Sequence, residues 1–324
     1  MHASGLRPID VRRDLGEVAD LIGDAFADEL DQGGLSALRE MRTLGQMGPF
    51  TQFLSRVSTE FDDMLGGFVW VEDNHVIGNV TVQRADTYGQ RWAIANVAVA
   101  PAFRGRGISR KLMAAALEHI TSRGGKWVVL QVRQNNDVAR GLYERMGFDT
   151  LGGIGDYRLE RLPANLDSSP LMIHPLHNSE WHAVYELATA GTPSLMQWWQ
   201  PVRADEFQMY LERRVQESFL RLVGHSRVFR LAVPNTHGSR PFDAVAIIHA
   251  ARWRGTHSLR VYVHPEQHGT LEVPLLANVL QILQDFPVFP ITTRVQATHE
   301  PVIAALRMFG FCEVKTLLTM RKRL

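Results

Sequence analysis

The pattern of apolar and polar positions at the start of the chain predicts strands and helices in turn. Residues 6–11 form a short candidate strand, and from Asp14 onward apolar residues recur at helical spacing. Apolar, β-branched runs at 67–71 and 76–83 flank four polar residues, which is typical of a hairpin. Residues 35–64 give no clear element.

The pattern becomes more regular after a further predicted strand at 92–99. A helix is predicted over 108–122, and a continuous apolar run at 127–132 indicates a strand buried on both faces. A second helix is predicted over 138–146 and a closing strand over 157–162. This order predicts an α/β fold with a mixed sheet.

The second half of the chain repeats the first. Residues 97–101 have a counterpart at 261–265, and Gly147-Phe148 has one at Gly310-Phe311. From the proline of the first pair to the glycine of the second, the intervals are 46 and 45 positions. We therefore predict two tandem copies of one fold, the second of them degenerate.

Length and composition agree with two globular domains. The 324 residues exceed the usual size of a single core, and a polar stretch at 163–170 bracketed by prolines is a candidate linker, which divides the chain into 1–163 and 164–324. The 35 basic and 34 acidic residues give a net charge of +1, so no general attraction to nucleic acid or membranes is expected. Cys312 is the only cysteine, and neither a signal sequence nor a membrane-spanning run is recognisable. We expect a cytoplasmic protein.

The segment that follows the strand at 92–99 carries the most chemistry, because a glycine-rich loop there leads into a helix. Free N–H groups at a helix N-terminus bind anions, and glycine lets phosphate oxygens approach the backbone. Arg104, Arg106, Arg110 and Lys111 add local positive charge. A Walker loop and the third glycine of the dinucleotide fingerprint are both absent. We interpret the loop as a pyrophosphate cradle, with a tight basic turn as the alternative.

The loop resembles the Arg/Gln-x-x-Gly-x-Gly/Ala loop of the GCN5-related N-acetyltransferase (GNAT) superfamily. Arg104, Gly107 and Ser109 occupy the defining positions, and Ser109 departs from Gly/Ala there. Residues 136–148 resemble the family's Asn-x-x-Ala-x-x-Leu-Tyr…Gly-Phe segment at every key position. The tandem arrangement resembles that of mycothiol synthase.

The resemblance implies an N-acetyltransferase that moves an acetyl group from acetyl-CoA to a primary amine by direct attack. In the family the pantetheine arm lies in a gap between the two strands that flank the loop and its helix. Tyr143 is expected to act as general acid toward the departing thiolate, and Asn136 to hold the pantetheine arm or the splayed backbone. The expected cofactor-binding residues are Val97, Ala98, Val99, Arg104, Gly105, Arg106, Gly107, Ile108, Ser109, Arg110, Asn136, Ala139 and Tyr143.

The general base and the acceptor stay open. Family members often place a carboxylate on the central strands, whereas this chain has the uncharged Asn96 and Gln131. Other candidate bases, each also interpretable as a surface group, are Asp86, His75, Glu72 and His119. We expect a small-molecule or peptide amine as acceptor, and a homodimer is one option. The alternatives are a non-catalytic acyl-CoA-binding or regulatory module, or a scaffold with a vestigial loop.

The second copy lacks the residues that carry this chemistry. Leu271 stands where Gly107 stands, and Glu272 beside it adds negative charge. Leu306 aligns with Tyr143. We predict that this copy does not bind acyl-CoA in the usual way.

The second copy could instead pack against the first, shape the acceptor pocket or form a dimer. Residues 191–193 and Trp198-Trp199 could line a cleft, or the tryptophans could be core residues. Ten of the 13 histidines follow residue 163, and His299 aligns with Asn136, but no familiar metal-ligand spacing accompanies them. We expect no metal.

Overall fold

The chain forms two compact units that interleave in sequence. The computed structural model describes residues 4–27, 32–46, 66–163, 166, 170–208, 210, 226–236, 238 and 240–324. Unit 1 comprises residues 1–132, 136–150 and 319–324, and unit 2 comprises 133–135 and 151–318. These limits differ from the predicted boundary after residue 163, and most of the predicted linker at 163–170 lies outside the described residues. The strand expected to close the first copy belongs to unit 2.

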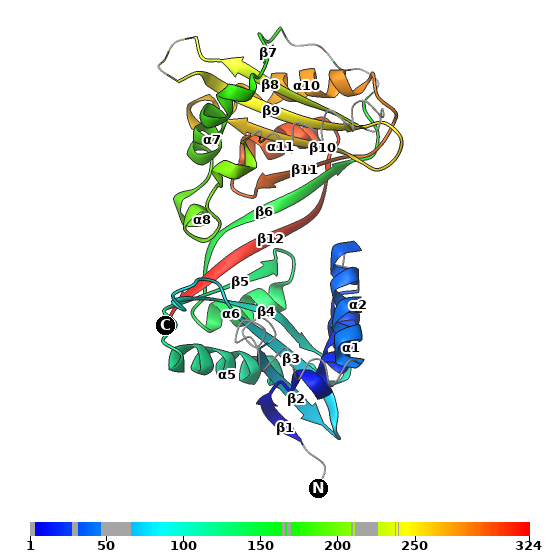
Figure 1. The fold of residues 1–324 in the computed structure, drawn as a ribbon, viewed down its shortest axis with the longest axis vertical. Helices are drawn as coiled ribbons and strands as arrows, with labels where there is room; N and C mark the ends of the chain where they lie inside the picture. Colours follow the sequence, from blue (N-terminus) through cyan, green and yellow to red (C-terminus); the bar gives the residue numbers. More distant parts are fainter. Residues whose placement is uncertain are drawn as a thin grey trace. The chain divides into compact units, whose positions relative to one another are not determined.

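Unit 1 is built on a sheet whose neighbouring strands run antiparallel from β1 to β4, with β4 and β5 parallel (Figure 1). The predicted hairpin is formed by β2 and β3. The elements of this half of the chain are β1 (Gly5–Pro8), α1 (Val11–Ala25), α2 (Gln32–Gln46), β2 (Gly67–Glu72), β3 (His75–Arg84), β4 (Arg91–Val99), α5 (Ile108–Ser122), β5 (Trp127–Arg133), α6 (Asp137–Arg145) and β6 (Asp149–Leu159).

Helix α1 begins three residues before the predicted start at Asp14, for an electrostatic reason. Asp10 is the N-cap, and its side chain accepts a hydrogen bond from the Arg12 N–H at 3.0 Å. Asp14 is buried and binds Arg7 through two hydrogen bonds of 2.5 and 2.7 Å. Its Oδ2 also accepts the Asp10 N–H at 2.8 Å. Asp14 therefore ties β1 to the helix from inside its first turn.

Helix α5 packs closely against the sheet of unit 1. A side chain at Gly78 of β3 would place its Cβ 3.1 Å from both Ile108 and Leu112 of the helix. Both of these helix residues are buried, as are Met113, Ala116 and Ile120. The absence of a side chain at Gly78 therefore lets α5, and the loop that precedes it, lie close to the strands.

Unit 2 has a sheet in the order β12-β6-β11-β10-β9-β8-β7, in which β10 and β11 are the parallel pair. β6 is antiparallel to β11 over residues 154–159, so this strand completes the sheet of unit 2. The elements after β6 are β7 (His174–Pro175), α7 (Trp181–Ala190), α8 (Ser194–Trp199), β8 (Ser226–Pro234), β9 (Phe242–Ala251), β10 (His257–Val263), α10 (Glu272–Leu283), β11 (Ile291–Gln296), α11 (Glu300–Met308) and β12 (Cys312–Arg323).

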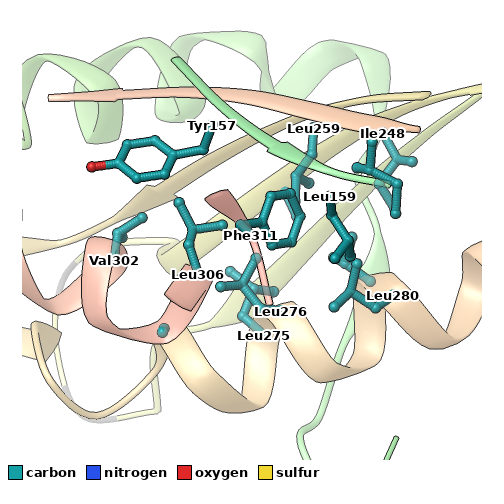
Figure 2. Close-up of a cluster of buried hydrophobic side chains, with 14 of the residues drawn as sticks. Tyr157, Leu159, Ile248, Leu259, Leu275, Leu276, Leu280, Val302, Leu306 and Phe311 are labelled. Carbon is teal, nitrogen blue, oxygen red and sulfur yellow. The ribbon is translucent and has the colours of Figure 1, made fainter. Parts of the chain in front are cut away.

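The core of unit 2 lies between its sheet and the helices α10 and α11. Figure 2 shows side chains from the strands β6, β9 and β10 meeting side chains from both helices. Leu275, Leu276 and Leu280 of α10 are completely buried there, and Leu306 of α11 is 1% exposed. Burying such side chains is the main favourable contribution to folding, at about 1.5–3 kcal/mol each.

The predicted repeat is present as two equivalent series of elements. β4, α5, β5 and α6 of the first series correspond to β10, α10, β11 and α11 of the second. A short 3-10 turn follows the first strand in each series, at Pro101–Phe103 and Pro265–Gln267. Within the described residues, no helix has the length and apolar character needed to cross a membrane.

The Asp14 contacts give a prediction about stability. Asp14→Asn should lower the free energy of unfolding by about 2 kcal/mol, because Arg7 loses its charged partner inside the protein. Chemical denaturation followed by circular dichroism measures this loss. Asp20→Asn is the matched control, since Asp20 pairs with Arg42 at 2.8 Å but is 65% exposed, and should cost under about 1 kcal/mol. Equal losses in the two variants would contradict the role given to Asp14.

Candidate functional site

The strands β4 and β5 diverge partway along their length. Their parallel pairing covers only Arg91 to Ile94 on β4 and Trp127 to Leu130 on β5. The last part of β4, which contains the predicted residues Val97, Ala98 and Val99, has no register with β5. This is the divergence that the family resemblance implied. Backbone groups on that edge of β4 face a gap in the ladder rather than a neighbouring strand.

A β-bulge in β4 lies at the point of divergence. The register between β3 and β4 shifts between Asn79 and Thr81, and Asn96 opposite has a positive φ of 51°. Asn79 is fully buried, and its Nδ2 donates to the Asn96 carbonyl oxygen at 3.0 Å. Asn96 Nδ2 in turn donates to Thr81 Oγ1 at 3.3 Å. The sequence pattern did not single out Asn79, although an asparagine inside an apolar run is visible in the sequence.

The loop after β4 has the geometry of an open anion cradle. Gly105 and Gly107 have φ angles of 79° and 74°, and a Cβ on either would have no neighbour within 4 Å. Gly107 is the N-cap of α5 and provides no side-chain cap. The first helical hydrogen bond runs from the Lys111 N–H to the Gly107 carbonyl at 3.2 Å, so the N–H groups of Ile108, Ser109 and Arg110 precede it. Glycine suits these positions because it adopts a positive φ without strain and because it leaves the space in front of the helix N-terminus open.

Three basic side chains of the loop and of the first turn of α5 contact other residues of unit 1. Arg104 Nε donates to the Val99 carbonyl oxygen at 3.1 Å, which fixes the loop to the end of β4. Arg106 pairs with Glu72 at 3.3 Å, and Lys111 lies over the ring of Trp70 at 4.9 Å. Arg104, Arg106 and Arg110 are exposed. Their charge therefore reaches the space in front of the helix N-terminus.

Tyr143 lies on α6, and its side chain is buried. It is 6% exposed and packs against Phe148, with ring centroids 6.0 Å apart. Burial raises the pKa of Tyr143 to about 12, because the phenolate would lose its hydration. The hydroxyl group is therefore protonated at any pH at which an enzyme works, and it is available as a hydrogen-bond donor.

Asn136 caps the helix that carries Tyr143. Its side-chain oxygen accepts a hydrogen bond from the Ala139 N–H at 3.0 Å. Asn136 and Ala139, both predicted to bind the donor, thus form the start of α6. The contact fixes the helix directly after the part of β5 that is not paired with β4. The structure thus gives Asn136 a positioning role.

The candidate bases do not gather at the divergence of the strands. Asp86 lies beside Arg91, at the start of β4 rather than at its end. Burial opposes its charge, but hydrogen bonds from Arg91 and Gln90 outweigh burial and hold the pKa of Asp86 below its usual value. His75 is 77% exposed.

Of the other two candidates, Glu72 contacts the donor loop and His119 lies away from it. Glu72 pairs with Arg106, and the ring of His119 packs edge-on against Phe68 and Trp92. Asp86, His75 and His119 are thus accounted for by contacts or exposure away from the donor loop, and the Glu72 carboxylate is paired with the Arg106 guanidinium.

Part of the chain is similar to known acetyltransferases. Residues 35–148 match the acetyltransferase (GNAT) family. The chain is 31% identical to mycothiol acetyltransferase of Kocuria rhizophila over 146 residues, which are 44% of this chain and 45% of that protein. Over these residues the chain is therefore similar to the GNAT family. It is also 36% identical over 85 residues to N-alpha-acetyltransferase 30 of Schizosaccharomyces pombe, covering 25% of this chain and 55% of the relative. It spans about half the length of these curated relatives.

The likeness in fold extends over both units. A GCN5-related N-acetyltransferase from Sphaerobacter thermophilus aligns with 98% of this chain and 95% of its own, with a TM-score of 0.58 and 16% identity. At this identity the match concerns the fold alone. The fold is thus like that of this structure over both units, while the residues that match the GNAT family lie in unit 1.

In the corresponding loop of unit 2, a glutamate side chain fills the position that is open in unit 1. Leu271 has a φ of −97° where Gly107 has a positive φ. Glu272, buried in the first turn of α10, accepts the Gly269 N–H through Oε2 at 2.8 Å. Burial opposes its charge, but contacts with His299 and the backbone hold the pKa of Glu272 below its usual value. A carboxylate therefore occupies the place where a phosphate would be bound.

The tyrosine position in unit 2 is a core leucine. The Phe311 N–H bonds the Leu306 carbonyl at 3.0 Å, as the Phe148 N–H bonds the Tyr143 carbonyl at 3.0 Å. This match places Leu306 at the position of Tyr143, as the sequence predicted. Figure 2 shows Leu306 within the hydrophobic cluster, beside Phe311. Unit 2 thus keeps the arrangement of elements seen in unit 1 without the phenol.

The cap at Asn136 gives a prediction. Asn136→Ala should lower the free energy of unfolding by about 1 kcal/mol, because the Ala139 N–H loses its acceptor, and Asn136→Ser should retain most of that stability. Urea denaturation measures both. Asn135→Ala, an exposed neighbour outside the cap, is the control and should be close to neutral. A loss in Asn136→Ser as large as in Asn136→Ala would rule out capping as the function of the side chain.

Proposed function

We propose that unit 1 transfers an acetyl group from acetyl-CoA to a primary amine. The observation that carries the proposal is the combination of two features at one end of β4. The strand leaves β5 after Ile94, and the open, glycine-lined N-terminus of α5 follows directly. A long donor with a diphosphate at one place and an amide-bearing arm at another fits this pair of features.

The two ends of such a donor would meet different backbone groups. The diphosphate would accept hydrogen bonds from the N–H groups of Ile108, Ser109 and Arg110, with support from the helix dipole and the exposed arginines. The amides of the pantetheine arm would pair with the free edge of Val97 to Val99, as an added strand pairs with a sheet edge. The thioester would then lie in the gap between β4 and β5.

The reaction is an acyl transfer between two nucleophiles. The neutral amine nitrogen attacks the thioester carbonyl carbon, a C–N bond forms, and the C–S bond breaks. The thiolate leaves and the nitrogen releases one proton to solvent, so the products are an amide, a thiolate and a proton. With a pKa of about 12, the Tyr143 hydroxyl is a weaker acid than a thiol near pKa 8.5, so complete proton transfer would be uphill by about 5 kcal/mol. Donation of a hydrogen bond to the developing thiolate is the role that this value supports.

For the acceptor we propose only a chemical class, a primary amine. The curated relatives include acetyltransferases named for mycothiol, for protein α-amino groups and for the alanine of ribosomal protein bS18. These names span small molecules and polypeptide ends, so a primary amine is their common chemistry. Because three of the four candidate bases lie away from the donor loop and Glu72 is paired with Arg106, we assign no base, and the amine would attack in its neutral form.

Donor binding is tested at Gly107. Gly107→Glu should weaken acetyl-CoA binding at least about 10-fold, because a carboxylate would enter the anion cradle. Gly107→Asn, which tolerates the same positive φ but adds no charge, should weaken it less. Isothermal titration calorimetry on the full chain measures both.

The matched control for this binding test is Thr270→Glu, an exposed site on the corresponding loop of unit 2. It should leave acetyl-CoA affinity unchanged. An absence of acetyl-CoA binding in the wild type would overturn the proposal.

The role of Tyr143 is tested by rate and pH. Tyr143→Phe should lower kcat by about 10²–10³ with little change in the KM for acetyl-CoA, because the hydrogen bond forms only as the thiolate develops. The wild-type rate should rise as the amine loses its proton and should not fall by pH 10, since Tyr143 ionises only near 12. Thiol release from acetyl-CoA with a panel of amines measures both.

Tyr157→Phe is the control for the rate measurement. Tyr157 is another buried tyrosine, located in the core of unit 2, and its removal should leave kcat near the wild-type value. A Tyr143→Phe variant with unchanged turnover would exclude the phenol from the reaction.

A further inference from the structure

Three potential metal ligands from separate elements meet at the closed loop of unit 2. His268 lies in the loop after β10, Glu272 in the first turn of α10, and His299 at the start of α11. One ligand atom from each lies within 4.8 Å of the others. The rings of the two histidines are 4.0 Å apart between centroids. The fold therefore brings together two imidazoles and one carboxylate.

Two atoms of this cluster are buried without a hydrogen-bond partner. They are Glu272 Oε1 and His299 Nε2, and the side chains that carry them are 2% and 15% exposed. An unpaired buried carboxylate oxygen costs free energy unless something binds it. Glu272 Oε2 already accepts the Gly269 N–H, so Oε1, which faces His299 Nε2, is the oxygen available to a ligand.

The spacing of the two unpaired atoms fits a shared cation. They lie 3.4 Å apart, which is long for a hydrogen bond. Two ligands at about 2.0–2.1 Å from a tetrahedral ion are separated by about 3.4 Å. The distance therefore matches a bridging ion better than a direct contact.

His268 has the arrangement expected of a histidine ligand. Its Nε2 lies 3.2 Å from the Val263 carbonyl oxygen, to which it can donate a proton. That hydrogen bond selects the tautomer with a lone pair on Nδ1, and metal-binding histidines commonly donate their other N–H to a carbonyl in this way.

We propose that His268, Glu272 and His299 bind a divalent ion of the zinc class in unit 2. Two imidazoles and one carboxylate suit a first-row divalent metal, in particular Zn²⁺ with one position left open. His299 also lines a cavity of about 530 Å³ together with Val261, Gln296 and Thr192. The open position of the ion would therefore be reached from this cavity, where water or a small anionic or amine ligand could complete the coordination.

The cavity arises from the same strand geometry as the site in unit 1. β10 and β11 are paired only at residues 257–259 and 291–293, and the strands diverge beyond them. Gly191 and Thr192 line this space, as expected from the sequence, while Trp198 and Trp199 are not among its lining residues. The proposed metal would thus stand where the donor loop of unit 1 faces its own gap.

Sequence spacing could not reveal the site. His268 and Glu272 are close in the chain, but His299 joins them only because α11 begins beside the start of α10. The competing interpretation is a protonated His299 paired with Glu272, with no metal at all. The two interpretations differ in whether added Zn²⁺ binds.

The test is metal binding by the full chain after removal of metals with a chelator. Equilibrium dialysis against Zn²⁺ should load one ion per chain, and Co²⁺ in its place should give the intense visible absorption of a tetrahedral site. Glu272→Gln and His299→Asn should each weaken Zn²⁺ binding more than about 100-fold. His299→Asn is expected to fold, because asparagine caps the equivalent helix in unit 1 at Asn136.

The control variant is His182→Ala on α7. His182 and Glu186 form an exposed histidine–carboxylate pair at 3.3 Å in the same unit, and this variant should keep the wild-type zinc affinity. A second measurement needs no variant, because Zn²⁺ bound to the native state must raise the Tm of the wild-type chain. No rise in Tm, or zinc binding unchanged in Glu272→Gln and His299→Asn, would overturn the proposal and leave the ion pair as the explanation.

Discussion

The separation of β4 from β5 is the constraint on which the rest of unit 1 depends. Pairing ends after Ile94, where the bulge at Asn96 bends β4 and where Asn79 supports the bulge from inside the sheet. A free backbone edge is thereby created in the middle of a sheet, where it would otherwise be paired. The close packing of α5 over Gly78 then sets its N-terminus at the end of the same strand.

Unit 2 has the same arrangement of strands and helices as unit 1, but different side chains occupy the equivalent positions. The strands β10 and β11 also diverge, and the C-terminal ends of α6 and α11 have the same backbone hydrogen bond. Yet the loop amide at Gly269 is satisfied by Glu272, and the phenol position is filled by Leu306 in the core. One copy leaves its backbone donors open to a ligand, whereas the other satisfies them with its own carboxylate. The two copies thus share one architecture but differ in whether the loop before the helix is open to a ligand.

The local elements were largely predictable because their causes are local. Helical spacing of apolar residues predicted α5 and α6, and two β-branched runs around a turn predicted the hairpin of β2 and β3. The start of α1 was predicted wrongly at Asp14, because a side chain that looks like a cap is instead buried against Arg7. The division of the chain into units was equally hidden, since strand pairing, which a linker pattern does not report, assigns β6 to unit 2.

For the site, the sequence by itself determined the residue types whose chemistry depends on their immediate neighbours. The glycines of the donor loop and the loss of Gly107's equivalent in the second copy could be identified from motif spacing, whereas the capping contact of Asn136 became visible only in the structure. Only the tertiary structure decided the features that need distant segments to meet. These are the gap between β4 and β5, the buried support from Asn79, the raised pKa of Tyr143 and the meeting of His268, Glu272 and His299. Burial and distance are properties of packed elements, and a linear pattern contains neither.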